Sequence, residues 1–210
     1  CLPNKWHLMS VMLSASSCLD WICSITNTSI QDSLVNAENC FSDTSLLSNL
    51  PYFLPYLSGE RTPHNDPHVR GSFHSLKTTT NAANIQYAVI EGVSFGILDG
   101  INSILKVNNN LEKFFIGGGG SKSYFWNELL ASMLNRKLNV CKQSEYVAAL
   151  GVARLAMYSD ENIKNQTNII KEIKISKVYK PKSEKTTILN KRYAIWKDLY
   201  SSKKTLHPIS

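Results

Sequence analysis

The sequence lacks paired cysteines, and this absence limits the class of protein that it can encode. None of its five cysteines belongs to a CxxC pair, and their number is odd. They are scattered along the chain as Cys1, Cys18, Cys23, Cys40 and Cys141. This pattern argues against a disulfide framework and predicts reduced, mostly buried thiols of a cytosolic protein.

Signals for secretion and for membrane insertion are also missing. The opening residues CLPNKWHLMS contain no basic region, long apolar run or small-residue cleavage site. Because the chain opens with Cys1 rather than Met, we expect it to be a fragment of a longer protein. The longest apolar stretch, residues 82–105, is interrupted by Asn84, Glu91 and Asp99, whose burial in lipid is costly. We therefore predict neither a transmembrane span nor a membrane partner.

Acidic residues are scarce near the carboxy terminus, where the positive charge is concentrated. The formal net charge is +7, and residues Lys164 to Lys204 contain 12 Lys and Arg against 3 Asp and Glu. These cations are interleaved with Asn, Ile, Thr and Ser rather than arranged in a recognisable nucleic-acid motif. We expect a solvated, charged surface and no nucleic-acid partner.

The apolar fraction of 43% and the length of 210 residues are typical of a soluble globular chain with one sizeable domain, or one and a half. Apolar spacing predicts a helix over residues 11–25, followed by short helical turns and loop over 26–49. Two short β-like runs, PYFLPYL and GSFHSL, flank the turn-rich segment GERTPHNDPHVR.

The clearest predicted helix begins after Asn81 or Asn84 and ends at Leu105. Gly92, Gly96 and Gly100 lie four residues apart and therefore on one face of it. Each glycine costs about 1 kcal/mol relative to Ala inside a helix. The face therefore predicts close approach of another backbone.

A βαβα unit follows this helix. Residues 111–116 predict a strand, four glycines predict a turn, and a helix begins near Ser123. A short strand, LNVC, and a second helix, EYVAALGVARLAMY, complete the unit. A Lys-rich stretch then leads to a last amphipathic helix over residues 188–200.

The glycine run GGGGSKS places backbone amides at a helix amino terminus, where they can approach a phosphate or a nucleotide. It does not fit the Walker A loop, which requires Gly where this chain has Ile116 and Ser121. It also fails the GxGxxG fingerprint, because Lys122 occupies the third glycine position. From these residues alone, a structural turn and a ligand site both stay open.

Four blocks in order resemble the FGGY family of sugar kinases. FLPYLSGERTPHNDPHVRG closely resembles the signature loop in the carboxy-terminal half of the xylulose kinases of that family. Residues 118–126 resemble its GGGAxSxxW adenosine motif, with Ser121 at the usual Ala position. AALGVARLA is similar to its AALGAARLA helix, and WHLMSVMLSASSCLDW resembles the segment that follows its second phosphate-binding turn.

The resemblance implies an α/β fold: a partial actin-like ATPase (ribonuclease H-like) domain, with helices packed on a small mixed sheet. Residues 1–160 would form the carboxy-terminal FGGY kinase domain, truncated at its amino terminus. Residues 161–210 would form a basic tail with a closing amphipathic helix. The implied activity is the ATP-dependent and Mg²⁺-dependent phosphorylation of D-xylulose to D-xylulose 5-phosphate by a cytoplasmic enzyme, which could be a homodimer.

The resemblance also assigns site residues. Gly119, Gly120, Ser121 and Tyr124 would lie against the adenine and ribose of ATP. Ser16 and Asp20 would face the same nucleotide. Two departures from the family pattern lie in the AALGVARLA region, where Val147 replaces a usual Gly and Val152 a usual Ala. Added methyl groups in a close-packed helix usually cost about 1 to 3 kcal/mol.

No catalytic residue is assigned to this chain. The family's general base is an Asp in a GGGD-type block, and no such block occurs in the 210 residues. The resemblance also implies that Mg²⁺ is held mainly outside them. We therefore expect the chain alone to be inactive.

Charged residues in the signature loop have two further interpretations. Glu60, Arg61, Asp66 and Arg70 could form ion pairs that hold the loop. The spacing of His64, Asp66 and His68 suggests a metal site, but the intervening prolines do not make the ligands converge, so none is predicted.

Two alternatives to the xylulose kinase remain. One is a non-catalytic actin-like module that binds a nucleotide or a partner. The other is a kinase for ribulose, gluconate or glycerol.

Overall fold

A computed structural model describes residue 4 and residues 6–159 and 173–203. The helices are α1 (Ser17–Thr26), α2 (Ile30–Ser42), α3 (Thr44–Leu47), α4 (Ala82–Leu105), α5 (Tyr124–Leu134), α6 (Val147–Ser159) and α7 (Ser183–Lys203). The strands are β1 (Tyr52–Leu54), β2 (Ser72–His74), β3 (Phe114–Ile116), β4 (Leu138–Cys141) and β5 (Ile175–Tyr179). Two 3-10 turns are η1 (Gly119–Lys122) and η2 (Ser144–Tyr146).

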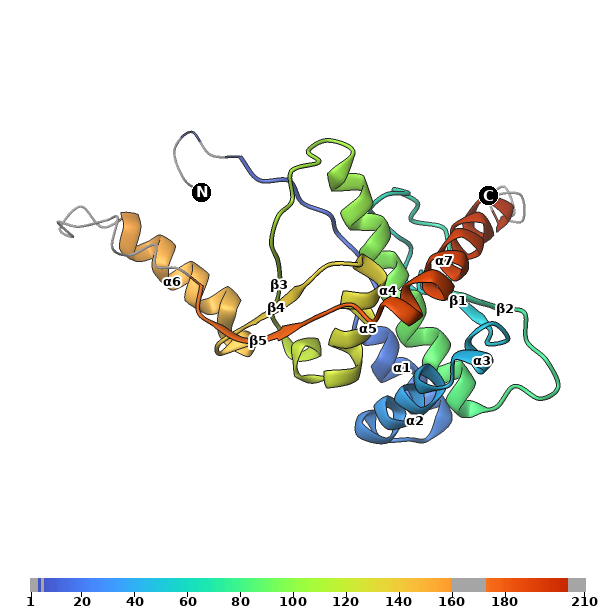
Figure 1. The fold of residues 1–210 in the computed structure, drawn as a ribbon. Coiled ribbons are helices and arrows are strands. Elements are labelled where there is room, and N and C mark those ends of the chain that lie inside the picture. The colour runs from blue at the N-terminus through green and yellow to red at the C-terminus, as the bar shows by residue number, and fades with distance from the viewer. Residues whose placement is uncertain (1–3, 5, 160–172, 204–210) are drawn as a thin grey trace.

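The long helix α4 is the centre of the fold. It contacts α1, α2, α5, α7 and β1, and α7 also packs directly on α5 (Figure 1). Asn81, one of the two predicted caps, is the N-cap of α4, and its reciprocal hydrogen bonds with Asn84 complete a capping box. By length and composition α4 is the one helix in the described ranges that could cross a bilayer, yet 56% of its most apolar window is buried by its neighbours.

The glycine face of α4 confirms the predicted backbone approach at one position. The carbonyl of Phe53 in β1 lies where a β-carbon on Gly92 would sit. At Gly96 and Gly100 the neighbours are side chains instead, from Met12 and Ser10. The glycines therefore let β1 and the chain's first segment lie directly on α4.

The sheets confirm the predicted βαβα unit. β3 and β4 are parallel, with Phe114 opposite Leu138, and α5 connects them. β5 pairs antiparallel with β4, which makes the sheet mixed, in the order β3-β4-β5. β5 was not predicted from the sequence, because its residues lie in a Lys-rich stretch. β1 and β2 pair antiparallel as a separate ribbon.

Two predictions near the amino terminus are wrong. The first helix begins at Ser17 rather than at residue 11. The preceding residues are irregular, with bends at 13–15, because Val11 exchanges backbone and side-chain hydrogen bonds with Thr62, and the amide of Leu13 donates to the Glu60 carboxylate. Residues 30–42, expected as short turns and loop, form one helix capped by the Ser29 side chain.

The last helix, α7, is longer than predicted at both ends and contributes two buried cations. The Nζ of Lys185 donates to the carbonyls of Phe41 and Ser42 at the end of α2, where a cation complements the helix dipole. Arg192 is 2% exposed and pairs with Glu91 of α4. The predicted solvated surface is therefore wrong for these two residues, because the charged group of each is buried and donates hydrogen bonds to buried oxygen atoms.

Thirty-one buried side chains from both sheets and most helices form one apolar core. Within the described residues, Cys18, Cys23, Cys40 and Cys141 are buried and unpaired, as predicted. Cys1 lies outside those residues.

Candidate functional site

The glycine run forms an open turn between β3 and α5. Gly118 has a φ of +87°, a conformation that favours glycine. A β-carbon added at Gly118, Gly119 or Gly120 would meet nothing within 4 Å. The backbone of this turn is therefore uncovered on its outer side, and a ligand can approach it without side-chain obstruction.

The turn is held from behind by η2, the 3-10 turn that follows β4. The amide of Gly118 donates to the carbonyl of Ser144 at 2.7 Å. The hydroxyl of Ser121 lies 2.6 Å from the Gly118 carbonyl and 2.7 Å from the Ser144 hydroxyl. Lys122 and Glu145 add an ion pair of 2.8 Å, although both side chains are well exposed. Both segments follow parallel strands, so they meet at the same edge of the sheet.

The helix that follows fixes the turn from below. Ser123 caps α5 by accepting the amide of Trp126, and the side-chain amide of Asn127 donates to the Ser121 carbonyl at 2.7 Å. The indole of Trp126 donates to Ser94 of α4 at 2.9 Å and is almost fully buried. The central helix thereby positions α5, and α5 positions the turn.

The predicted site residues occupy different environments. Gly119 and Gly120 lie on the uncovered side of the turn, whereas the Ser121 side chain points inward to Ser144. Tyr124 packs edge-on against Tyr179 of β5, with ring centroids 5.3 Å apart. The Nζ of Lys177 lies 4.4 Å from the Tyr124 ring centroid, a cation–π contact.

Ser16 and Asp20 are solvent-exposed at the start of α1. Within the described ranges, neither shares a hydrogen bond or an ion pair with the glycine turn. Their proposed role toward the nucleotide therefore stays a prediction.

A cavity of about 760 Å³ lies beside the turn, between the strand ends and α6. Gly117, Val147 and Leu150 supply apolar or small surface, and Lys142 and Arg154 supply positive charge. The AALGVARLA helix therefore lines a cavity next to the glycine turn. α6 itself extends away from the body of the molecule (Figure 1), and none of its described residues is buried.

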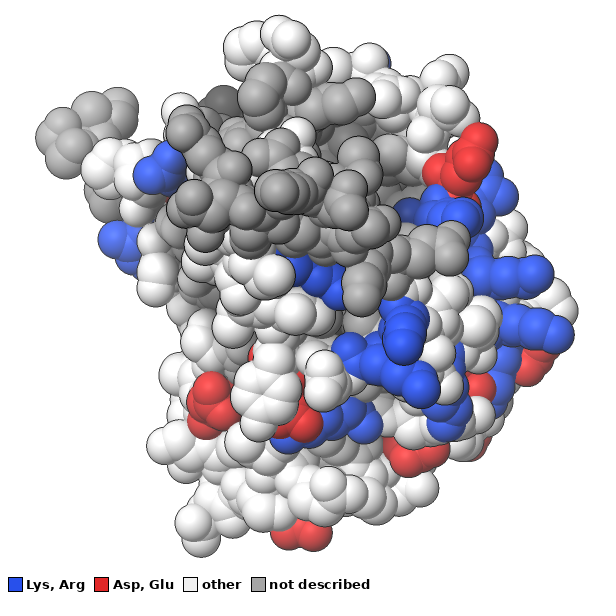
Figure 2. All heavy atoms as spheres, turned by 90° about the vertical axis from the view of Figure 1, so that its left-hand side faces the viewer, with Lys and Arg blue, Asp and Glu red and all other residues white. Residues whose placement is uncertain are grey.

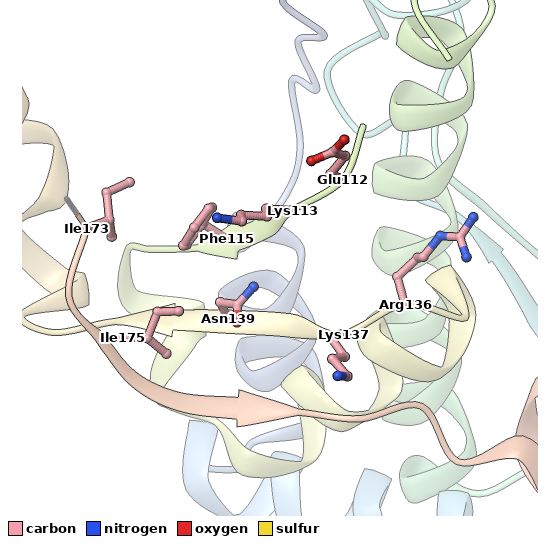
Figure 3. A pocket seen from close by; sticks show the side chains of 8 residues that line it. All are labelled: Glu112, Lys113, Phe115, Arg136, Lys137, Asn139, Ile173 and Ile175. Atoms are coloured by element: carbon pink, nitrogen blue, oxygen red, sulfur yellow. The ribbon is translucent and has the colours of Figure 1, made fainter. Parts of the chain in front are cut away.

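A second pocket of about 610 Å³ opens on the same sheet and shares Phe115 and Ile173 with the first. Figure 3 shows Phe115 and Asn139 over the strands, with Arg136 and Lys137 at the end where β4 begins. Figure 2 shows Lys and Arg gathered on this side of the molecule, with fewer Asp and Glu. The local field therefore favours an anionic ligand over a cationic one.

The signature loop is held mainly through its backbone. The buried Glu60 carboxylate accepts the amides of Leu13 and Arg61, and burial raises its pKa. The Asp66 carboxylate accepts the amides of His68 and Val69. These contacts hold both carboxylates against backbone amides of the loop and of the preceding segment.

Helix α7 packs against the same loop. The Tyr200 hydroxyl donates to Asp66, and its ring stacks on His64 with centroids 3.6 Å apart. Tyr56 also contacts His64, at 3.0 Å from its Nε2. In the part of the chain that the structure describes, no three His, Cys, Asp or Glu side chains gather as metal ligands.

Ser144 and Asn127 shape the turn and were not identified from the sequence. Ser144 lies three residues after a strand that is parallel to the one before the glycines. That position predicts a neighbour at the same sheet edge and could have identified it. Asn127 gave no comparable signal, because it looks like any polar helical residue.

Residues 1–159 match the FGGY family of carbohydrate kinases, C-terminal domain. The chain therefore belongs to this family. It is 33% identical over 199 residues to the xylulose kinase of Escherichia coli strain K12, covering 95% of this chain and 40% of that protein. The chain thus spans about two fifths of the length of this curated relative.

Solved structures agree with this assignment. A xylulose kinase from Brucella ovis superposes with a TM-score of 0.85 and 30% identity, over 98% of this chain and 42% of that one. A gluconate kinase from Lactobacillus acidophilus superposes with a TM-score of 0.71 and 27% identity, over 90% and 38%. The predicted actin-like α/β fold with a small mixed sheet is confirmed.

Proposed function

We propose that this chain supplies the adenosine-binding side of the cleft in a cytoplasmic, ATP-dependent kinase that converts D-xylulose to D-xylulose 5-phosphate. The observation that carries the proposal is the uncovered glycine turn at Gly118–Gly120, braced by Ser144 in a chain of the FGGY family. Because glycine has no side chain, the flat base of a nucleoside can lie directly against the backbone of this turn.

The predicted site residues would have different roles toward the nucleotide. Gly119 and Gly120 would present bare backbone to adenine and ribose, and Ser121 would keep the turn in shape through Ser144. Tyr124 would border the site while it packs against β5, and Ser16 and Asp20 would approach the nucleotide from α1. The residues 1–160 would form the kinase domain, and the basic tail from 161 would close it through α7.

The chemistry itself depends on groups that these residues do not supply. Phosphoryl transfer requires a positioned base, both phosphate-binding turns and Mg²⁺. The 210 residues contain no GGGD-type block, and the described residues offer no metal cluster. We therefore propose that the chain alone binds adenosine nucleotides without turning over sugar, and that Mg²⁺ is held elsewhere.

D-Xylulose is the favoured sugar because GERTPHNDP resembles the xylulose kinase signature and the Escherichia coli relative is a xylulose kinase. The gluconate kinase of similar fold makes gluconate the alternative to test. We propose no nucleic-acid or membrane partner, and a homodimer is compatible with the proposal.

The proposal is tested by titrating the 210-residue chain, fused to a soluble carrier, with fluorescent ADP. We expect saturable binding that unlabelled ADP competes away. Gly119→Val fills the uncovered side of the turn, where nothing lies within 4 Å, so it should abolish binding while the melting temperature stays unchanged. Thr78→Val, at an exposed position before α4, is the matched control and should bind like the parent chain. Absence of saturable binding by the parent chain contradicts the proposal.

A further inference from the structure

Gly117 and Val147 form a contact that accounts for the extra glycine before the adenosine motif. The adenosine motif matches residues 118–126, so Gly117 precedes it and is a fourth glycine. A β-carbon at Gly117 would collide with Cγ2 of Val147 and lie 3.1 Å from the Ser144 carbonyl. A methyl group of Val147 therefore occupies the space that a side chain at residue 117 would need.

This contact shows how the structure accommodates Val147 where the family usually has Gly. Val147 is the first residue of α6, and its side chain is half-buried. The missing side chain of Gly117 accommodates its added methyl groups. The second departure, Val152, is 67% exposed and meets no such constraint.

The contact belongs to a brace behind the turn. Ser144 binds the Gly118 amide and the Ser121 hydroxyl, and Glu145 pairs with Lys122. Val147 is the apolar member of the same short segment, residues 144–147. A β-carbon on Gly118, Gly119 or Gly120 would meet nothing within 4 Å, so the contacts that hold the turn on the α6 side come from this brace.

We propose that Gly117 and Val147 are a coupled positioning pair, in which the Val147 methyl sets where the turn lies and only glycine at 117 tolerates it. The inference rests on the proposed function, because the turn is positioned for adenosine. A larger residue at 117 would push the turn away from η2 and misplace Gly119 and Gly120. A smaller residue at 147 would leave the turn without its apolar support.

The test is a double-mutant cycle in the carrier-fused 210-residue chain, with melting temperature and fluorescent-ADP affinity as readouts. Gly117→Ala should lower the melting temperature by about 3 to 10 °C, as expected for overpacking in a chain of this size. It should also weaken ADP binding about tenfold. Val147→Ala should weaken ADP binding by a smaller factor, because it removes support without a collision.

The combination Gly117→Ala with Val147→Ala should restore both readouts toward the parent values, because the new β-carbon enters the space left by the methyl groups. Gly119→Ala is the matched glycine control. It should leave the melting temperature unchanged, since no atom lies within 4 Å of its added carbon, and weaken only ADP binding. This separates blocking of the ligand from displacement of the turn.

The coupling is overturned if Gly117→Ala melts and binds like the parent chain. It is equally overturned if the double variant is no better than Gly117→Ala, which also covers the case in which Gly117→Ala fails to fold. If the double variant regains the parent melting temperature but the parent chain itself binds no ADP, the nucleotide-positioning role and the proposed function are both refuted. Rescue of melting temperature without rescue of ADP affinity would refute the positioning role alone.

Discussion

Replacing Arg192 by Met should strongly destabilise the fold. The Arg192 guanidinium donates to both carboxylate oxygens of Glu91, at 2.7 and 2.6 Å. It also donates to the carbonyls of Leu47, Leu50 and Pro51, which end the α3 region and lead into β1. One side chain therefore joins α7, the central helix and the start of the hairpin.

The magnitude follows from what the substitution leaves behind. Glu91 is 1% exposed, so Arg192→Met strands a buried carboxylate with the Tyr87 hydroxyl as its remaining donor. Removing one partner of a buried ion pair typically costs about 3 to 5 kcal/mol. In a chain of this size that corresponds to a fall of about 6 to 20 °C in melting temperature. Met fills much of the vacated volume, so little of the loss comes from a cavity.

Thermal unfolding followed by circular dichroism measures this loss. Lys191→Met is the matched control, because it removes the same charge from the adjacent, exposed position of α7. Adding Glu91→Leu to Arg192→Met should recover part of the stability, since no charge is then buried, while three carbonyls still lack their donor. An Arg192→Met chain that melts within about 2 °C of the Lys191→Met chain would refute the reasoning, since the buried-pair cost corresponds to a larger shift.

Two further predictions concern the core. Gly92→Ala should lower the free energy of unfolding in a urea titration by about 1 to 3 kcal/mol, because its methyl group meets the Phe53 backbone carbonyl, which cannot move without displacing β1. Gly151→Ala, in open space on α6, is the control and should be neutral or slightly stabilising. Equal effects of the two substitutions would contradict the packing account. Burial, with a contribution from Glu60, raises the pKa of the Cys18 thiol from 9.0 to about 12. The unfolded chain therefore releases this proton first, so stability should fall as pH rises above about 9, by at most about 1.4 kcal/mol per pH unit. Cys18→Ala should show a shallower decline between about pH 9 and pH 10 in urea unfolding, and an unchanged slope would contradict this assignment.

Local signals predicted the elements whose residues determine their own structure. Asn81 and Asn84 cap α4, and the strand, glycine turn and helix around Ser123 lie where their turn and capping residues indicate. The glycine spacing on α4 also predicted the approach of another backbone, which is found at Gly92. In each case the signal lies within the element itself or a few residues from it.

The errors arose where distant residues decide the structure. Residues 11–16 have helical spacing, yet hydrogen bonds from Val11 and Leu13 to Thr62 and Glu60 keep them out of the helix. β5 forms in a Lys-rich stretch because β4 offers an open edge, although its β-branched and aromatic residues were a usable signal. No local pattern indicates that Arg192 of an outwardly basic helix is buried, because its partner is 101 residues away.

The candidate site shows the same division. Gly119 and Gly120 were identified from the motif and lie on the uncovered side of the turn. The supports at Ser144 and Val147 come from a separate segment, and only the assembled sheet edge brings them to the turn. The Tyr124 ring is engaged by β5, a strand that the sequence analysis had not expected.

The central claim, that the glycine turn of this FGGY-family chain receives adenosine, is tested most directly by comparing fluorescent-ADP binding to the parent chain and to Gly119→Val. The account predicts saturable, competable binding by the parent chain and its loss in the variant, with both chains melting at the same temperature. Equal binding by the two chains would contradict it, because the nucleotide would then lie somewhere other than the uncovered side of Gly118–Gly120.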